Sequence, residues 1–219
     1  MRALALAAAS LLAAGCGIAT HVRPTPRGAF EVEASAGGPL ANLGAPIPIP
    51  LSTVGASYGF GERWDLQAHL HLTTLALKTA GADVGGSWLA LEQHGLRPAL
   101  SLTARAYAFS DLASAVQPYG ELTATASWAS GRWTAYGTAS GMLDYGGRFL
   151  WSPGVGARVA LGRFGAQLDL RWYEPAYSTA HSSVPWVGPG ALGALGVVLG
   201  ASYRFGELAP PSPPASPAG

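Results

Sequence analysis

Residues 63–76 read Arg-Trp-Asp-Leu-Gln-Ala-His-Leu-His-Leu-Thr-Thr-Leu-Ala, and apolar side chains alternate with polar ones along most of this stretch. Apolar residues such as Leu66 and Leu70 occupy even positions, whereas Asp65 and His69 occupy odd ones. Successive side chains of a β-strand point to opposite faces, so a period of two predicts a strand with one apolar and one polar face. We therefore expect one long strand over residues 63–76.

The same alternation recurs nine more times between residues 28 and 205. It is clear over residues 96–109, 117–129, 132–144 and 164–173, and weaker over residues 28–36, 52–60, 83–92, 153–162 and 191–205. Very short turns at residues 61–62, 93–95, 130–131 and 162–163 alternate with longer links, one of which contains the extended, proline-rich stretch 45–50. Ten strands are thus expected, with short turns at one end and longer loops at the other.

This order of strands and connections resembles that of small bacterial outer-membrane β-barrel proteins, and the resemblance covers residues 28–206. It implies an all-β fold, an antiparallel up-and-down transmembrane β-barrel of about 10 strands (8 to 12). It also implies the outer membrane of a Gram-negative bacterium, with both termini in the periplasm and the long loops facing outward. Membrane lipid and lipopolysaccharide are the partners that such a location implies.

The composition favours a barrel that meets lipid over a soluble one. Charged residues make up 11 % of the chain, whereas a soluble globular domain carries about 25 %. In the phase expected to face outward, Glu92 is the one charge inside a strand. The formal net charge of +1 offers little to attract a polyanion, so nucleic acid is not an expected partner. Outside residues 3–19 the chain has no apolar run close to the about 20 residues that a helical membrane span needs.

Aromatic residues of the outward phase gather beside the short turns, where a membrane barrel carries an interfacial girdle. The expected aromatic girdle comprises Tyr58, Phe60, Trp64, Trp128, Trp133, Phe164, Tyr203 and Phe205. A second group near the long loops, which would form the other girdle, comprises Tyr145, Phe149, Trp151, Trp172, Tyr177 and Trp186.

The N-terminus carries the pattern of an export signal. A positive residue precedes an apolar stretch, so residues 1–15 are expected to be a signal peptide. Leu-Ala-Ala-Gly-Cys at residues 12–16 resembles a bacterial lipobox, which implies lipid attachment at Cys16. Residues 16–27 would then be a periplasmic tether before the barrel. The alternative, cleavage after Ala19, would discard the cysteine.

The only cysteine and the C-terminal tail set two further limits. Because Cys16 stands alone, the chain has no intramolecular disulfide and no multi-cysteine zinc site. Residues 207–219 are rich in proline and small residues, so we expect a disordered tail there.

Charged residues of the inward phase nearly balance in sign, which predicts a network of pairs in a narrow or plugged polar lumen. A GC-rich genome would account equally well for twelve arginines against one lysine. The luminal charge network is expected to comprise Arg63, Asp65, Arg97, Arg105, Glu121, Arg132, Asp144, Arg158, Asp169, Arg171 and Arg204, with Glu31 and Glu33 on the same phase.

One constellation has the residue types of catalysis: Asp65, His69 and His71 share a strand face, with Ser101, Tyr107 and Glu121 on possible neighbouring strands. The chain has no nucleophile motif such as Gly-x-Ser-x-Gly, no phosphate-binding loop and no zinc spacing. We therefore expect no enzyme, and no catalytic residues, metal or cofactor.

These features predict an integral outer-membrane β-barrel lipoprotein with a structural or interaction role, its protein partners left open. Three alternatives stay open. They are a restricted channel for small solutes, a membrane-embedded hydrolase or acyltransferase, and a soluble lipoprotein barrel that binds an apolar ligand.

Overall fold

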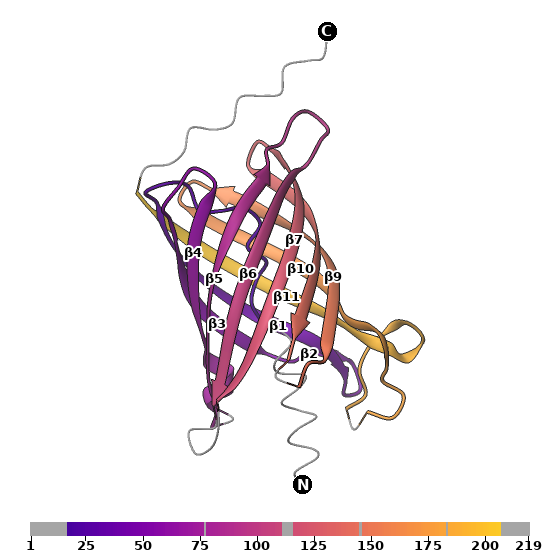
Figure 1. The fold of residues 1–219 in the computed structure, drawn as a ribbon. Coiled ribbons are helices and arrows are strands. Elements are labelled where there is room, and N and C mark those ends of the chain that lie inside the picture. The colour runs from indigo at the N-terminus through magenta and orange to yellow at the C-terminus, as the bar shows by residue number, and fades with distance from the viewer. Residues whose placement is uncertain (1–16, 77, 111–115, 145, 183, 207–219) are drawn as a thin grey trace.

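The computed structural model describes residues 17–76, 78–110, 116–144, 146–182 and 184–206. Ten antiparallel strands form one sheet, and the last strand pairs with the first, so the sheet closes into a barrel (Figure 1). These strands are β1 (Phe30–Asn42), β3 (Leu51–Gly59), β4 (Trp64–His71), β5 (Ala80–Leu91), β6 (Ala99–Ser110), β7 (Gln117–Ser130), β8 (Trp133–Leu143), β9 (Phe149–Leu161), β10 (Phe164–Ser178) and β11 (Leu192–Phe205). The predicted all-β, ten-stranded up-and-down barrel is confirmed.

Each barrel strand pairs with its neighbours in the chain, and the β1–β11 pairing removes the two free edges of the sheet. The seam between these two strands runs from Phe30 opposite Phe205 to Pro39 opposite Gly196. We call the end of the barrel where β1 begins and β11 ends the short-turn end, because the connections β3–β4, β7–β8 and β9–β10 are shortest there. The opposite end is the long-loop end.

The structure differs from the expected strand over residues 63–76. β4 ends at His71, and a short helix, α2 (Leu72–Ala76), follows it. The pairing of β4 with β3 stops where Thr53 lies opposite His71. Instead of extending the sheet, the Thr74 hydroxyl donates a 2.7 Å hydrogen bond to the His71 carbonyl, which closes a helical turn.

Two short elements at the long-loop end add to the ten strands. β2 (Pro46–Pro48) pairs with the end of β1, within the stretch that was expected to be an extended loop. A single 3₁₀ turn, η1 (Pro189–Ala191), leads into β11. No helix among the described residues is long and apolar enough to cross a membrane.

The two faces of the barrel differ in polarity as the alternation predicts. Leu66 and Leu122 point outward and are 60 % and 69 % exposed. Their neighbours of opposite phase, Asp65 and Glu121, are buried in the interior. The barrel is thus apolar outside and largely polar inside, apart from a buried cluster that includes Ile18, Phe109 and Met142, which is the reverse of a soluble barrel with an apolar core.

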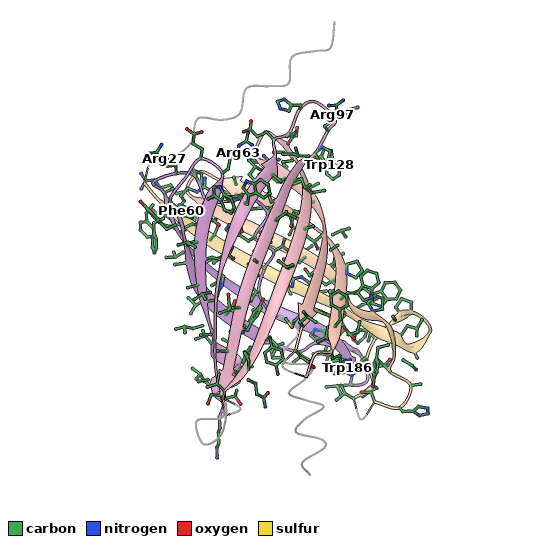
Figure 2. The ribbon with its side chains drawn as sticks, in the orientation of Figure 1. Arg27, Phe60, Arg63, Arg97, Trp128 and Trp186 are labelled. Carbon is green, nitrogen blue, oxygen red and sulfur yellow. The ribbon has the colours of Figure 1, made fainter. Side chains whose placement is uncertain are left out.

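Aromatic side chains of the same strand and of neighbouring strands contact one another at the short-turn end. Ring centroids are 4.8 Å apart between Phe164 and Tyr203 and 4.7 Å apart between Tyr203 and Phe205. Trp64 stacks on Trp88 at 5.5 Å. The expected girdle residues Tyr58, Phe60, Trp64, Trp128, Trp133, Phe164 and Phe205 are exposed and Tyr203 is half-buried, with Phe60 and Trp128 labelled in Figure 2.

The second aromatic group lies toward the long-loop end. Phe149, Trp151 and Tyr177 are exposed, and Trp172 and Trp186 are half-buried. Tyr145 lies outside the described residues, as do Cys16, the expected signal peptide and the expected tail. Figure 2 shows Trp186 at the opposite end of the barrel from Phe60 and Trp128.

Candidate functional site

Residues 17–27, which we call the N-terminal segment, run along the inside of the barrel beside β3. Gly17 lies against Leu51, the first residue of β3, and the Pro26 carbonyl lies against Gly59, the last. Between these points Ile18 and Val22 are each only 2 % exposed. The segment therefore passes from the long-loop end to the short-turn end before the chain turns back into β1.

Strands from opposite sides of the barrel hold the N-terminal segment. On one side, Asp65 of β4 accepts a 2.7 Å hydrogen bond from the Thr25 amide and lies 2.5 Å from His21 Nε2. The other oxygen of Asp65 accepts from the amide of Ser87 at 3.1 Å. This carboxylate is fully buried, so it joins the segment, its own strand and β5 through one group.

β10 holds the segment on the other side. Asp169 accepts a 3.1 Å hydrogen bond from the Thr20 amide, and Gln167 donates to the Thr20 carbonyl at 2.8 Å. Arg171 donates to the Ile18 carbonyl at 2.6 Å and to the Thr20 hydroxyl at 3.1 Å. Backbone groups of the segment that have no strand partner are thus paired with luminal side chains, as buried polar groups must be.

The structure corrects the expected tether over residues 16–27. Its described part, residues 17–27, lies inside the barrel and not beside it. Both termini were also expected on the periplasmic side, where the short turns lie. Gly17 instead lies against Leu51 toward the long-loop end, whereas Gly206 follows β11 at the short-turn end.

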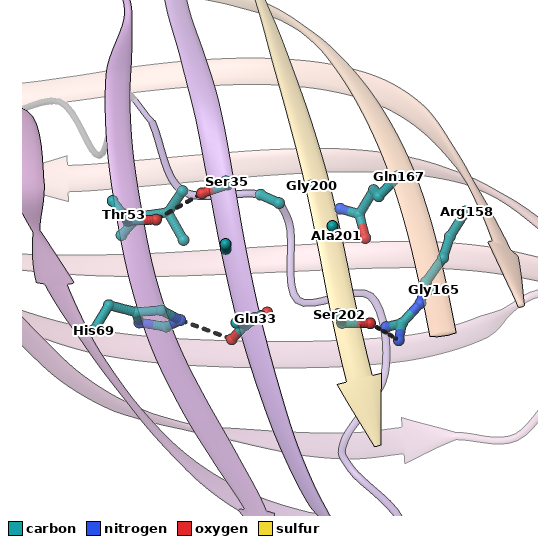
Figure 3. A pocket seen from close by; sticks show the side chains of 13 residues that line it. Glu33, Ser35, Thr53, His69, Arg158, Gly165, Gln167, Gly200, Ala201 and Ser202 are labelled. Atoms are coloured by element: carbon teal, nitrogen blue, oxygen red, sulfur yellow. Dashed lines mark hydrogen bonds and ion pairs between the residues drawn. The ribbon is translucent and has the colours of Figure 1, made fainter. Parts of the chain in front are cut away.

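Near the middle of the lumen, two histidines of β4 bind three carboxylate oxygens. His69 lies between Asp83, 2.8 Å from its Nδ1, and Glu33, 2.7 Å from its Nε2. Figure 3 shows the contact with Glu33. His71 Nε2 lies 3.1 Å from the second oxygen of Asp83. Asp83 is missing from the expected network, although the pairing of β4 with β5 places it directly opposite His69. Its position on the inward phase of residues 83–92 was the signal that sequence reasoning overlooked.

The expected luminal charge network divides into two groups. Seven of its eleven members line the interior: Asp65, Arg105, Glu121, Arg158, Asp169, Arg171 and Arg204. The other four lie in connections at the barrel ends, because the strands stop before reaching them: Arg63, Arg97, Arg132 and Asp144.

The four residues in connections have local contacts or are exposed. Arg63 forms an exposed ion pair with Glu92 at 3.0 Å. Asp144 accepts hydrogen bonds from loop amides, among them that of Arg148 at 2.8 Å. Arg132 lies over the ring of Trp133 and also borders a cavity at the short-turn end, whereas Arg97 is exposed in the β5–β6 connection.

The luminal charges form hydrogen bonds with neutral groups as well as ion pairs. Arg105 donates two hydrogen bonds to Gln67, at 2.6 and 3.0 Å. Glu121, opposite Arg105 across β6 and β7, accepts from the hydroxyls of Tyr107 and Thr123.

A direct ion-pair cluster lies nearer the short-turn end. Glu31 binds Arg158 at 2.5 Å and Arg204 at 2.9 Å. Arg158 donates a further hydrogen bond, of 3.0 Å, to the Ser202 hydroxyl.

The constellation that suggested catalysis has no serine or threonine hydroxyl bound to an imidazole among the described residues. The imidazoles of His21, His69 and His71 hydrogen-bond carboxylates instead. Ser101 Oγ is buried without a hydrogen-bond partner. No cluster of histidine, cysteine and carboxylate side chains in the described part of the chain has the arrangement of a metal site.

Little open space remains beside the N-terminal segment at mid-height. The cavity lined by Glu33, Ser35, Thr53 and His69 measures about 10 Å³ (Figure 3), which is room for about one water molecule. A cavity below the long loops, beside Glu121 and Arg171, measures about 20 Å³. A larger cavity of about 240 Å³ opens at the short-turn end.

The geometry defines a class by fold: a closed, up-and-down β-barrel with an apolar exterior and an occupied lumen. No protein-family model matches the chain, and no curated protein sequence matches it.

Among solved structures, this chain is similar to the translocator domain of the autotransporter NalP from Neisseria meningitidis, with 14 % sequence identity and a TM-score of 0.41. The alignment covers 93 % of this chain and 94 % of the NalP chain. The outer membrane protein OprG from Pseudomonas aeruginosa is 11 % identical, with 84 % and 99 % covered and a TM-score of 0.34. At these values the likeness is one of barrel fold alone.

Proposed function

We propose that this chain is an integral outer-membrane β-barrel lipoprotein whose lumen is closed by its own N-terminal segment. Its role is structural or one of interaction at the membrane, and it is not an enzyme. The occupied lumen is the observation that carries the proposal, because a solute pathway needs continuous space along the barrel axis.

The outward surface supports a location in a membrane. Apolar side chains such as Leu66, Val84 and Leu122 cover the middle of the barrel at 60 to 69 % exposure. An exposed apolar surface of this extent costs free energy in water and is stable in hydrocarbon. Aromatic residues lie toward both ends of this surface, as they do where a membrane barrel crosses the two interfaces.

A gel assay tests the membrane barrel. We expect the purified chain in detergent to migrate differently before and after boiling, because a closed barrel resists dodecyl sulfate until it is heated. A far-ultraviolet spectrum rich in sheet, measured in the same detergent, confirms that the sample is folded. A folded chain that is soluble without detergent would support the alternative of a soluble barrel with an apolar ligand.

Conductance tests the closed lumen. We expect no steady conductance from the full chain in a planar bilayer, and steady conductance from a variant that lacks residues 17–25. The heat-dependent gel shift of both proteins shows that the barrel is intact in each. Steady conductance by the unaltered chain, at the level of an open porin, would replace this proposal with that of a channel.

Lipidation at Cys16 is a separate part of the proposal and rests on the lipobox-like residues 12–16. Metabolic labelling with a fatty acid should mark the unaltered chain but not Cys16→Ser. The serine variant should still reach the outer membrane, because the strands provide the apolar surface for insertion. An unlabelled parent chain would refute lipidation and leave the barrel unaffected.

A further inference from the structure

The cavity of about 240 Å³ at the short-turn end lies between the N-terminal segment and the strands β8 to β11. Its walls include five arginines and one carboxylate: Arg23, Arg132, Arg158, Arg163, Arg204 and Glu31. Five of the twelve arginines of the chain thus meet in one space, although the formal net charge of the whole chain is only +1.

The single carboxylate of the cavity is already in use. Glu31 binds Arg158 and Arg204 together and is itself buried. One negative charge between two positive ones leaves this group of three with an excess of one positive charge.

The other three arginines form no ion pair with a described carboxylate. Arg23 donates from Nε to the Ser127 hydroxyl at 2.9 Å and from Nη2 to Gln93 Oε1 at 2.8 Å, and both partners are neutral. Arg132 contacts the ring of Trp133, and Arg163 extends from the β9–β10 turn. The cavity therefore carries an excess of four positive charges in all.

The surroundings strengthen the effect of this charge. Arg23, Arg158 and Arg204 are half-buried, so water and salt screen them less than they screen arginines on an open surface. Elsewhere in the lumen, carboxylates lie near the arginines, as Glu121 lies opposite Arg105 across β6 and β7. An unbalanced cluster of arginines around open space is a site to which a multiply charged anion is attracted.

We propose that this arginine-lined cavity binds a phosphate-type anion that carries more than one negative charge. The planar guanidinium group donates paired hydrogen bonds to two phosphate oxygens at once, which favours phosphate over chloride. Pockets for drug-sized ligands range from about 300 to 1,000 Å³, so a cavity of about 240 Å³ suits a small anion or a headgroup.

Calorimetric titration with sodium pyrophosphate tests the proposal. The sample is the full chain in a nonionic detergent at fixed ionic strength, and the comparison is the double variant Arg132→Ala/Arg163→Ala. Both of these arginines lie in turns outside the strands, so the barrel should remain folded. We expect the parent chain to bind pyrophosphate and the double variant to bind at least about tenfold more weakly, because charge-assisted hydrogen bonds to phosphate are lost.

The matched control is Arg27→Ala/Arg97→Ala. Figure 2 shows Arg27 and Arg97 at the same end of the barrel, and both are exposed and outside the cavity lining. This pair removes the same charge, so we expect its affinity to change less than about twofold, as rim charges contribute little. Equal weakening in both double variants would show diffuse attraction to a positive surface and would overturn the proposal.

A second arm distinguishes free phosphate from a lipid headgroup. Parent chain and cavity variant are reconstituted in phosphatidylcholine vesicles with and without phosphatidic acid, and the temperature of the gel shift is measured. If phosphatidic acid raises the gel-shift temperature of the parent chain alone, and pyrophosphate does not bind, the ligand is a lipid headgroup. If pyrophosphate binds, the ligand is a soluble anion. Failure of both refutes the site, and this result is independent of whether the barrel conducts.

Discussion

At the scale of single residues, Asp65 joins more of the molecule than any sequence pattern indicated. The alternation places Asp65 on the polar face of residues 63–76. It does not indicate which groups Asp65 contacts. Asp65 accepts from the Thr25 amide and the Ser87 amide and contacts His21. Those partners come from the N-terminal segment and from β5, so one carboxylate determines where two other parts of the chain lie.

We expect Asp65→Ala to lower the free energy of unfolding by about 3 to 5 kcal/mol, because it leaves buried donors without an acceptor. The midpoint of the heat-dependent gel shift in detergent measures the loss. Asp144→Ala is the control, since Asp144 accepts its hydrogen bonds in an exposed loop. A shift no larger than that of the control would mean that the luminal hydrogen bonds contribute little.

A second residue-scale prediction concerns Gly55 of β3, which faces the imidazole of His69. A Cβ atom built on Gly55 would lie 2.0 Å from His69 Cδ2 and 2.6 Å from the Ala68 carbonyl oxygen. We expect Gly55→Ala to cost about 1 to 3 kcal/mol through overpacking, measured as before. Gly120→Ala is the matched control in β7, because a Cβ there meets nothing within 4 Å.

At the scale of elements, sequence periodicity predicted the barrel strands but not what fills the barrel. Period two identifies strands and their faces wherever a strand has two partners, as along β6 and β7. It failed after His71, where strand pairing ends and the strict alternation also breaks, because residues 72–76 read Leu-Thr-Thr-Leu-Ala. It also carried no signal for the N-terminal segment, whose proline-containing residues 17–27 are held by side chains of distant strands.

Site-directed labelling tests where this segment lies. In a Cys16→Ser background, the variant Val22→Cys should react slowly with a maleimide reagent, because Val22 is 2 % exposed. Arg27→Cys in the same background should react at once, because Arg27 is exposed just outside the segment's buried part. Mass spectrometry of the labelled chain provides the measurement. Equal rates at both positions would contradict a filled lumen.

At the scale of the whole molecule, the apolar outer face of the barrel leads to a prediction about the medium that surrounds this face. Leu122 lies near the middle of β7 on the outer face, and Leu96 is 94 % exposed in the β5–β6 connection. If the barrel spans a bilayer, Leu122→Lys should destabilise it by about 2 to 4 kcal/mol. Leu96→Lys should change little, because that position lies outside the strands.

Unfolding by urea in phosphatidylcholine vesicles measures both lysine variants. A barrel surrounded by water would tolerate lysine equally at the two positions, because both are exposed. Destabilisation confined to Leu122→Lys would therefore distinguish lipid from water as the medium around the outer face.

The course of the N-terminal segment also limits the routes by which the barrel can assemble. Arg171 binds the Ile18 carbonyl across 153 positions of sequence, and the ring around the segment is complete only when β11 pairs with β1. Contacts between such distant parts of a chain form slowly. Residues 17–27 therefore either dock before the last strand closes the seam or enter the lumen lengthwise afterwards, and once the seam is closed they can leave only by sliding out lengthwise or by reopening it.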